Sequence, residues 1–376
     1  MNFEPHIVIV AGEDSGDFHG ANLAVALRQQ LPQIRLSGIG GQKMEENGVD
    51  LIFPSARLAV VGITEVVSRL PDILAGYRAI RKHLRESQPD LLVLIDFPDF
   101  NLHLVAPYAR KLNIPIVYYI SPQVWAWRQG RVKSINKLVE KILVILPFEE
   151  EFYRRRGVAV EYVGHPLLDE FKSFRCRPRS ESSYIALIPG SRNGEVKRLL
   201  PLMLTAARLY TREKPSTRFL IPVAPSISIK FIKDIIPASL RDKVTLLRQP
   251  LSQALQKVSF ALVTSGTATL ETALAEVPMV VIYRVNQLSY QLGKRLISVP
   301  YISLVNLIAE KEIAPELIQD DAVPEKITAK MRHLFDNSEN YHKVCQELKA
   351  LKKRLGKAGA PQRAANAIIR VLRKNA

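Results

Sequence analysis

An acidic residue that directly follows an apolar run is the clearest candidate for acid–base chemistry in this sequence. The run Leu91–Ile95 has the composition of a strand buried on both faces, and Asp96 comes immediately after it. Burial can raise the pKa of such a carboxylate until it serves as a general base near neutral pH. We therefore predict that Asp96 is the base. Asp99 is either a second acid of the same site or the N-cap of a helix, and an N-cap is also the alternative for Asp96.

Two segments in the second half of the chain have residue types that bind a diphosphate. In the first, Gly190 and Arg192 follow the apolar run 184–188. Glycine lets the backbone approach a ligand closely, and a guanidinium group can bind phosphate oxygens with a forked pair of donors. We expect Arg192 to contact the diphosphate.

The second segment is a predicted helix start after the apolar run 260–263. The free backbone N–H groups and the dipole of a helix N-terminus attract an anion such as a β-phosphate. Glu271 lies about one helical turn further along and is expected to accept hydrogen bonds from ribose hydroxyls. A plain N-cap by Ser265 or Thr267 is the alternative. Small residues open this helix: Ser265, Gly266, Thr267 and Ala268.

An acidic loop that contains glycine follows the first apolar run, Ile7–Ala11. It lacks the glycine spacing of a dinucleotide-binding motif, and its three acids would repel a pyrophosphate. We expect the loop either to bind sugar hydroxyls or to form a tight turn from strand to helix. The candidate residues are Glu13, Ser15, Gly16 and Asp17.

Both tryptophans of the chain, Trp125 and Trp127, lie in one segment beside Arg128. Tryptophan stacks on the faces of sugars and is also favoured among lipid headgroups. We expect Trp125 and Arg128 to contact a sugar or a headgroup. Two tryptophans buried in a core are the alternative.

The elements that must position these residues alternate between apolar strands and helices, which predicts right-handed βαβ units and parallel sheets. We predict two doubly wound, Rossmann-like α/β domains that face one cleft. The N-terminal domain is expected over 1–170, a polar linker over 171–183 and the C-terminal domain over 184–340. Basic helices over 341–376 could pack back on the N-terminal domain. Strands are expected at 7–11, 34–38, 91–95, 114–120, 142–146, 184–188, 219–223, 244–247, 260–263 and 279–283.

The composition limits the class of protein. Of 376 residues, 47% are hydrophobic and 24% are charged, as in an ordinary globular protein. Cys176 and Cys345 lie far apart, so we expect neither a zinc site nor a disulfide framework, which suits a reducing compartment. The sequence has no signal-peptide pattern and no apolar run of transmembrane length. We therefore expect a cytoplasmic protein.

The formal net charge of +17 attracts phosphates of nucleic acid, anionic lipid or a nucleotide-sugar. Residues 341–376 contain ten Lys or Arg and one acid, so this segment is either a patch for a membrane surface or a solvated helix face. The apolar stretch 58–67 is a second candidate for membrane contact, with burial in the core as the alternative.

Nine short motifs occur along the chain in the order in which they occur in one known family. In these motifs the chain resembles the lipid-A-disaccharide synthase family of GT-B glycosyltransferases. The resemblance extends from about residue 8 to residue 320. Glu310 is one departure, because the family pattern leads us to expect glycine there. The matching segments are Gly12–Asp17, Gly38–Met44, Asp96–Asn101, Ser121–Arg128, Pro147–Glu149, Gly164–Pro166, Pro189–Arg192, Ser265–Glu271 and Ser303–Asn306.

The resemblance implies an inverting transfer. The sugar of UDP-2,3-diacylglucosamine would pass to the 6-hydroxyl of 2,3-diacylglucosamine 1-phosphate, giving UDP and the β-1,6-linked lipid A precursor of Gram-negative-type envelopes. By position, Asp96 matches the base, Arg192 and Ser265–Glu271 match the UDP site, and Asn306 matches a polar position of the cleft. Acylated substrates imply a peripheral enzyme on the anionic inner face of the cytoplasmic membrane.

We expect neither a metal nor a cofactor, because Arg192 and a helix N-terminus supply the positive charge that diphosphate departure needs. A UDP-N-acetylglucosamine 2-epimerase would share the fold and the nucleotide site but needs no lipid-facing surface. A nucleic-acid-binding protein would use the net charge but does not explain acidic, glycine-containing loops after strands, so we expect no nucleic-acid partner. The sequence is compatible with an oligomer.

Overall fold

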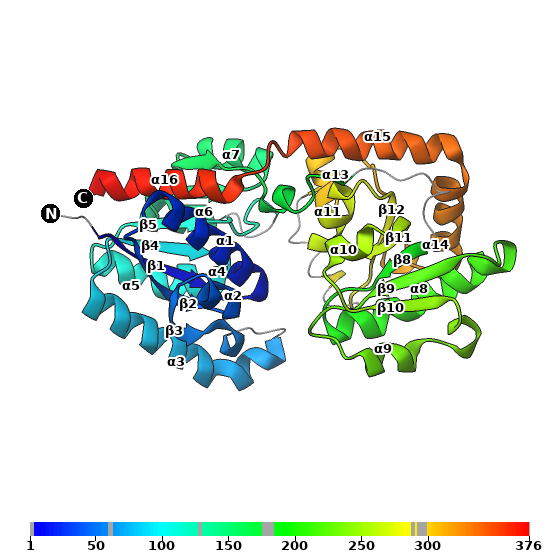
Figure 1. Ribbon diagram of the computed structural model, residues 1–376, viewed down its shortest axis with the longest axis horizontal. Coiled ribbons are helices and arrows are strands. Elements are labelled where there is room, and N and C mark those ends of the chain that lie inside the picture. The colour runs from blue at the N-terminus through cyan, green and yellow to red at the C-terminus, as the bar shows by residue number, and fades with distance from the viewer. Residues whose placement is uncertain are drawn as a thin grey trace. The chain divides into compact units, whose positions relative to one another are not determined.

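The computed structural model describes residues 4–58, 63–126, 130–174, 184–286, 290–291 and 299–375, with the backbone alone for 63–69 (Figure 1). The chain forms two compact units. The first contains Met1–Pro166 and Lys357–Ala376, and the second contains Leu167–Gly356. Of the two helices of the basic segment 341–376, α15 (Ser338–Arg354) therefore belongs to the second unit, and α16 (Ala360–Asn375) belongs to the first.

The described part of the first unit has a seven-stranded parallel sheet with the order β3-β2-β1-β4-β5-β6-β7. The order reverses between β1 and β4, as in a doubly wound fold. The strands are β1 (His6–Ala11), β2 (Arg35–Gly40), β3 (Asp50–Pro54), β4 (Leu91–Ile95), β5 (Ile116–Tyr119), β6 (Lys141–Val144) and β7 (Val160–Tyr162).

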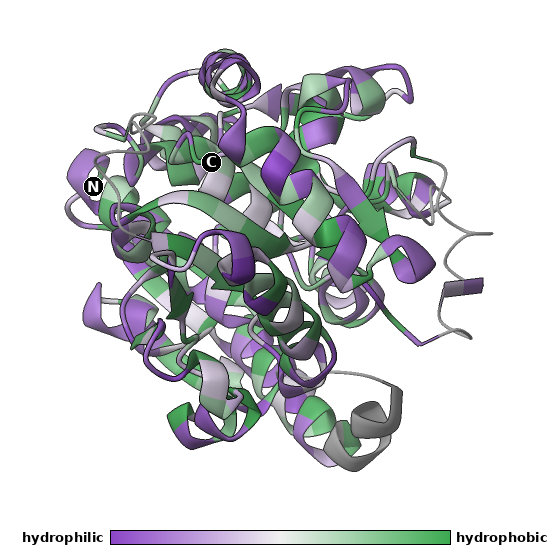
Figure 2. Cartoon of the chain, turned by 90° about the vertical axis from the view of Figure 1, so that its right-hand side faces the viewer, coloured by the Kyte–Doolittle hydropathy of each residue, from purple (hydrophilic) through white to green (hydrophobic). Residues whose placement is uncertain are grey.

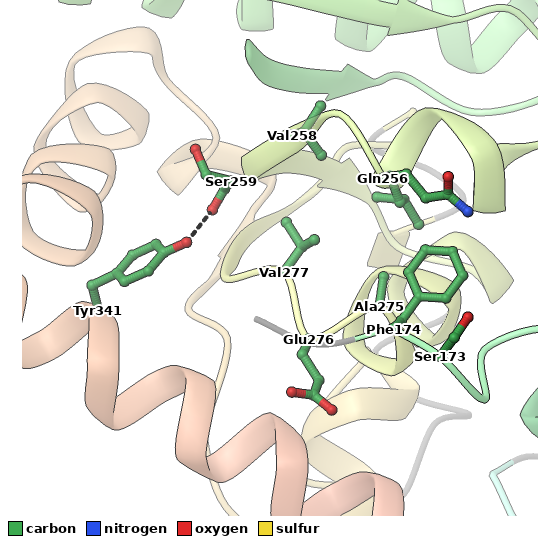
Figure 3. A pocket seen from close by; sticks show the side chains of 10 residues that line it. Ser173, Phe174, Gln256, Val258, Ser259, Ala275, Glu276, Val277 and Tyr341 are labelled. Carbon is green, nitrogen blue, oxygen red and sulfur yellow. Dashed lines mark hydrogen bonds between the residues drawn. The ribbon is translucent and has the colours of Figure 1, made fainter. Parts of the chain in front are cut away.

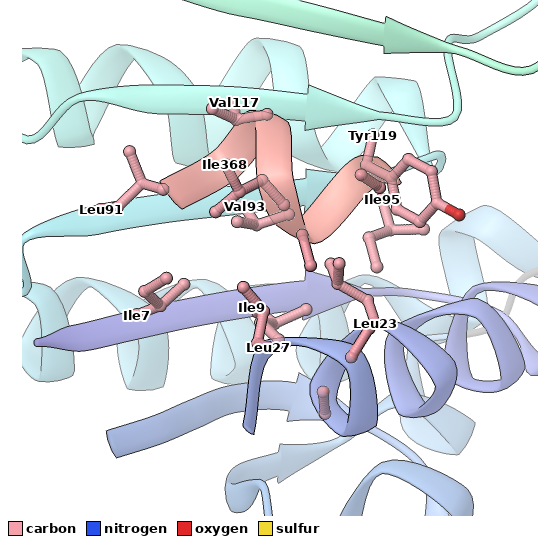
Figure 4. Packing of buried hydrophobic residues seen from close by; sticks show 14 of the residues in the cluster. Ile7, Ile9, Leu23, Leu27, Leu91, Val93, Ile95, Val117, Tyr119 and Ile368 are labelled. Carbon is pink, nitrogen blue, oxygen red and sulfur yellow. The ribbon is translucent and has the colours of Figure 1, made fainter. Parts of the chain in front are cut away.

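Alternate residues of these strands pack against two layers of helices. Ile7 and Ile9 face a cluster that includes α1 and α16, whereas Val8 and Val10 face a cluster that includes α3, α5 and α6. Figure 4 shows Leu23 of α1 and Ile368 of α16 packed over the first face. Besides α16, the described helices of this unit are α1 (Asp14–Gln30), α2 (Gln42–Glu46), α3 (Ile63–Ser87), α4 (Pro98–Phe100), α5 (Ala106–Lys111), α6 (Arg131–Leu138) and α7 (Pro147–Arg154).

The described part of the second unit repeats this plan with a six-stranded parallel sheet in the order β10-β9-β8-β11-β12-β13. Its strands are β8 (Tyr184–Ile188), β9 (Arg218–Pro222), β10 (Val244–Leu247), β11 (Val258–Thr264), β12 (Met279–Tyr283) and β13 (Glu316–Ile318). Its helices include α8 (Asn193–Glu213), α9 (Ile229–Ile235), α10 (Leu251–Leu255), α11 (Thr267–Leu274), α13 (Leu304–Ala309) and α14 (Pro324–Met331).

The prediction of two doubly wound parallel sheets is confirmed. Each of the ten expected strands is present, with ends that move by at most two residues. Three further strands were not expected from the sequence. They lie at sheet edges and are three to five residues long: β3, β7 and β13. Short edge strands have no buried apolar run to reveal them.

The C-terminal helix α16 is a core element. Ala364, Ala365 and Ile368 are fully buried against the first sheet. Arg363 donates to the carbonyl oxygens of Val163, Ala358 and Lys357 at 2.7, 2.8 and 2.6 Å. Arg363, one of the basic residues of 341–376, therefore stabilises the fold itself.

Helices of both units carry hydrophilic and hydrophobic residues in alternation along the chain (Figure 2). Among the residues that the structure describes, no helix combines the length and the apolar composition that crossing a bilayer requires.

Cys345 in α15 is disulfide-bonded, so the expectation that the chain uses no disulfide is wrong at this residue. Cys176 lies outside the described residues.

The structure gives a physical meaning to Glu310, the departure from the family pattern. Glu310 ends α13 in the left-handed conformation, with φ 58° and ψ 20°. Glycine is the usual residue at such a helix C-terminus because a Cβ atom costs about 1–2 kcal/mol there.

We predict that Glu310→Gly raises the free energy of unfolding by about 1 kcal/mol, since the exposed side chain is removed from a left-handed position. Calorimetry should record a melting temperature about 2–4 °C higher. Glu310→Ala keeps the Cβ atom and serves as the control. Equal melting temperatures for the glycine and alanine variants would contradict the explanation.

Candidate active site

The ends of β1 and β4 bring two of the candidate acidic residues, Glu13 and Asp96, to the same sheet edge. The two strands are neighbours, and Ala11 pairs with Ile95 in the parallel register. Gly12 and Glu13 therefore leave the sheet beside Asp96. The charge of Glu13 is one of the two causes that raise the pKa of Asp96. These two residues, named from separate segments of the sequence, share one site.

Asp96 has the properties expected of a general base. Burial, and then the charge of Glu13, raise its pKa from 3.8 to about 6. Its side chain is largely surrounded by protein but keeps a partly solvent-accessible surface. Asp96 and Phe97 are both left-handed, with φ 43° and 51°. Two such non-glycine residues cost about 1–3 kcal/mol each, and such strain occurs most often at functional sites.

The other residues of the acidic loop divide into two groups. Glu13 and Ser15 are exposed. Asp17 is buried, and its carboxylate accepts from the backbone N–H groups of Gly41, Lys43 and Met44 at 2.7, 3.1 and 3.0 Å. Asp17 therefore holds the start of α2. Gly16 is buried in α1, and a Cβ atom there would lie 3.2 Å from that of Ala11.

Trp125 is a core residue, as in the alternative considered for it. It is 7% exposed, and its ring packs edge-on against Phe148 at 4.8 Å between centroids. Its Nε1 donates to Glu149 Oε1 at 3.0 Å. It is therefore not placed to stack on a sugar. Trp127 and Arg128 lie outside the described residues.

Glu149, which we did not select as a functional residue, is fully enclosed beside this site. Its Oε2 accepts from the backbone N–H groups of Ile145 and Leu146 at 3.3 and 3.0 Å. Burial raises its pKa from 4.5 to about 7, and the charge of Asp96 adds to the increase. At 1% exposure the carboxyl joins the loop after β5 to the start of α7 but cannot meet a substrate. The motif Pro147–Glu149 was the available signal.

Asp99 is exposed and lies inside the short helix α4. It forms an ion pair with Arg131 and lies 3.8 Å from Nε2 of His103. The N-cap residue of α4 is Phe97, so the alternative role of Asp99 as an N-cap is wrong.

In the second unit, β8 and β11 are neighbours, with Ile188 paired to Val263. The loops that begin at Pro189 and Ser265 therefore leave the same sheet edge. Arg192 is the N-cap residue of α8, and its side chain is 56% exposed. Its Nη1 lies 3.2 Å from Glu195 Oε1. This guanidinium group has open access to a ligand at the strand ends.

The start of α11 has no side-chain cap in the described structure. Gly266, with φ 155°, is the N-cap residue, and the hydroxyl of Ser265 donates to the carbonyl oxygen of Ile302 at 3.1 Å. The alternative of a plain serine or threonine N-cap is therefore wrong. Thr267 is exposed, and Ala268 is partly exposed. The first backbone N–H groups of α11 remain suited to an anion.

Glu271 lies one turn inside α11 and is largely surrounded by protein. Burial, and then the charge of Glu170, raise its pKa from 4.5 to about 7. Because charged carboxylates accept hydrogen bonds more strongly than neutral acids, the ability of Glu271 to bind ribose hydroxyls should depend on pH near neutrality.

Asn306 is fully buried and supports the fold. Its Oδ1 accepts from the N–H groups of Ile313 and Ala314 at 2.8 and 3.0 Å. Its Nδ2 donates to Ala314 O at 2.7 Å and to Glu316 Oε1 at 2.9 Å. The polar cleft position implied by the resemblance is thus occupied by a residue that no substrate can reach directly.

Glu316 on β13 connects this network to the loop that contains Ser265. Its carboxylate accepts from Ile302 N at 2.9 Å and from both N and Oγ of Ser303, at 3.0 and 2.7 Å. Ile302 is the residue that Ser265 contacts. Glu316 was missed because β13 has no clear sequence signal.

A cavity of about 520 Å³ in the second unit lies away from these residues (Figure 3). Val258, Ser259 and Val277 line it at the beginnings of strands, whereas Arg192 and Ser265 follow strand ends. Within the described parts of the chain, no group of three or more His, Cys, Asp or Glu side chains is placed to hold a metal ion.

Two doubly wound sheets with these strand-end loops define a GT-B protein. Solved structures share this fold over nearly the whole chain. The calicheamicin glycosyltransferase CalG4 has a TM-score of 0.66 and 15% identity, covering 100% of this chain and 99% of that one. UDP-GlcNAc 2-epimerase from Neisseria meningitidis has a TM-score of 0.62 and 11% identity, covering 98% and 100%. At such identities the similarity establishes the fold alone.

The chain belongs to the lipid-A-disaccharide synthetase family, whose sequence model matches residues 7–368. It is 46% identical to lipid-A-disaccharide synthase of Syntrophus aciditrophicus, over 98% of both chains. It is 41% identical to that of Geobacter sulfurreducens, over 99% of both. The predicted family is confirmed, and the epimerase alternative is not favoured. The protein is a glycosyltransferase with a UDP-sugar donor and a sugar-phosphate acceptor.

We predict that Arg192→Ala and Glu271→Ala each weaken UDP binding by about 1–3 kcal/mol, because each removes a charge-assisted contact. Calorimetric titration measures this loss. In the wild type, UDP affinity should increase as pH rises through about 7 and Glu271 loses its proton, and Glu271→Gln should abolish that component.

Arg212→Ala, at the other end of α8, removes an exposed arginine and should leave UDP binding unchanged. Wild-type affinity in both the Arg192 and the Glu271 variants would show that these strand-end loops do not bind the nucleotide.

Proposed function

We propose that this enzyme transfers 2,3-diacylglucosamine, with inversion, from UDP to the 6-hydroxyl of 2,3-diacylglucosamine 1-phosphate. The products are UDP and the β-1,6-linked disaccharide phosphate. The proposal is supported chiefly by the position and the pKa of Asp96. Its carboxylate is partly accessible at the end of a buried strand, and burial and the charge of Glu13 raise its pKa to about 6. Such a group is unprotonated at neutral pH and remains basic enough to accept a proton.

In the proposed reaction, the carboxylate of Asp96 accepts the proton of the acceptor 6-hydroxyl. The oxygen attacks the anomeric carbon of the donor sugar as the bond from that carbon to the UDP oxygen breaks. Arg192 and the N-terminus of α11 stabilise the negative charge that develops on the departing diphosphate. The ribose of UDP binds Glu271.

Asp96→Asn should abolish turnover while UDP still binds, because the change removes the proton acceptor and keeps the volume. The loss is expected to be about 100-fold or more, measured as UDP release. For the wild type, kcat should fall as pH drops below about 6, because the base becomes protonated.

Asp234→Asn changes an exposed carboxylate on α9 and is the matched control. Near-normal turnover in Asp96→Asn would refute the assignment, and a loss in Asp99→Asn instead would move the role of base to Asp99.

We further infer that the enzyme acts on an anionic membrane, at the inner face of the cytoplasmic membrane of a Gram-negative-type cell. Helix α3 supports this inference, because Leu70 and Leu74 are 50% and 40% exposed and lie one turn apart. Further along α3, basic side chains are also exposed: Arg78, Arg81, Lys82 and Arg85. Apolar contact beside positive charge suits an interface with anionic lipid.

This surface differs from the stretch 58–67 considered from the sequence. Leu58 is fully buried, as in the core alternative. Residues 59–62 lie outside the described residues, and the side chains of 63–67 are not described. In the C-terminal segment, Arg354 donates to the carbonyl oxygens of Ile308 and Ala309, and Arg370 pairs with Glu161. The remaining exposed lysines and arginines of that segment could still face anionic lipid.

We predict that the double variant Leu70→Asn/Leu74→Asn loses vesicle binding by about tenfold or more, since full burial of one leucine contributes about 1.5–3 kcal/mol. High salt should release part of the wild-type protein from anionic vesicles, because it weakens only the charge contribution. Co-sedimentation with neutral and anionic vesicles, at low and high salt, measures both effects.

Val25→Asn, which changes an exposed apolar residue of α1, is the control. Equal binding of the α3 double variant and the wild type would exclude this surface.

A further inference from the structure

The turn that carries Asp96 is held in a conformation that its own residues disfavour. Asp96 and Phe97 are consecutive left-handed residues, with φ 43° and 51°, and neither is glycine. Such a backbone persists only where surrounding contacts determine it. The neighbouring strands supply those contacts.

Two buried donors meet at the backbone carbonyl oxygen of Asp96. The Tyr118 hydroxyl donates to it at 2.5 Å, and Asn101 Nδ2 donates to it at 2.7 Å. Both side chains are fully buried. Tyr118 reaches the turn from β5, because Leu94 of β4 pairs with Tyr118 in the register of the sheet. The carbonyl therefore points into the protein, where rotation of the peptide would break both hydrogen bonds.

Gly12, the first residue after strand β1, leaves space for the same turn. An ideal Cβ atom built on Gly12 would lie 2.2 Å from Cδ1 of Phe97, so the Phe97 ring occupies the place of a side chain at position 12. The Phe97 ring also lies 5.4 Å from that of Phe100. Contacts from β1, β5 and the segment after the turn thus fix both left-handed residues.

We propose that Tyr118 is a positioning residue for catalysis: its hydroxyl, with Asn101, anchors the Asp96 peptide and so keeps the carboxylate beside Glu13 at the sheet edge. The proposal rests on the proposed role of Asp96 as the base. Without the hydroxyl, the strained peptide can relax, and the carboxylate then moves away from Glu13 and into water. Both of the causes that raise its pKa become weaker after such a movement.

The test is Tyr118→Phe, which removes one oxygen and keeps the ring. We expect kcat to fall about tenfold or more with KM within about twofold, because the base is displaced and substrate contacts remain. The Asp96 carboxyl, followed by carbon NMR, should titrate at a lower pH than in the wild type, where burial and the charge of Glu13 raise its pKa to about 6. The acid limb of the kcat profile should move to lower pH with it.

Tyr341→Phe is the matched control, because Tyr341 is a buried tyrosine whose hydroxyl donates to a backbone carbonyl, that of Ser259, at 2.9 Å (Figure 3). It belongs to the second unit and should change neither kcat nor the Asp96 titration. A Tyr118→Phe enzyme with the wild-type Asp96 midpoint and wild-type kcat would overturn the proposal.

Gly12→Ala gives a second approach to the same turn, because the added methyl group must displace the Phe97 ring. It should shift the Asp96 midpoint in the same direction, and it tests the anchoring if Tyr118→Phe does not fold.

If Asp96→Asn retains turnover, the base assignment fails. The NMR midpoint in Tyr118→Phe still decides whether Tyr118 positions the carboxylate, so the two failures are distinguishable.

Discussion

The parallel pairing of β1 with β4 is the constraint on which the first site depends. Because Ala11 and Ile95 are in register, the chain leaves both strands at the same edge, and Glu13 and Asp96 meet there. A slip of one residue would turn the side chains of a strand to the opposite face. The buried faces of both strands prevent such a slip, so the hydrophobic core fixes the electrostatics of the site.

The buried carboxyl groups of both units are maintained at a cost in stability. Folding raises the pKa values of Asp96, Glu149 and Glu271 to about 6, 7 and 7. A carboxyl with a raised pKa binds its proton more tightly in the folded state, so the free energy of unfolding decreases as pH rises from the ordinary value to the raised one. Glu149 has three hydrogen-bond donors and is 1% exposed, so of the Asp96–Glu149 pair only Asp96 is accessible to an acceptor.

The sequence predicted what depends on local pattern. Apolar runs located the strands, and the position of Asp96 directly after one of them located the proposed base. The sequence could not show which polar side chains form hydrogen bonds within the protein and are therefore not free to bind a substrate. Asp17 and Asn306 bind backbone groups, and these partners are set by tertiary packing. From the sequence, Tyr118 is indistinguishable from other strand residues, because its hydrogen-bond partner, the carbonyl oxygen of Asp96, follows a neighbouring strand.

In the reaction that we propose, the carboxylate of Asp96 promotes direct attack of the acceptor hydroxyl on the donor sugar. One displacement inverts the anomeric centre, whereas a covalent sugar–enzyme intermediate would require two displacements and retain the configuration. The most direct test is the proton NMR spectrum of the disaccharide made by the purified protein from the two diacylglucosamine substrates. We predict that the new linkage has an anomeric configuration opposite to that of the donor. A product with the donor's configuration would contradict it.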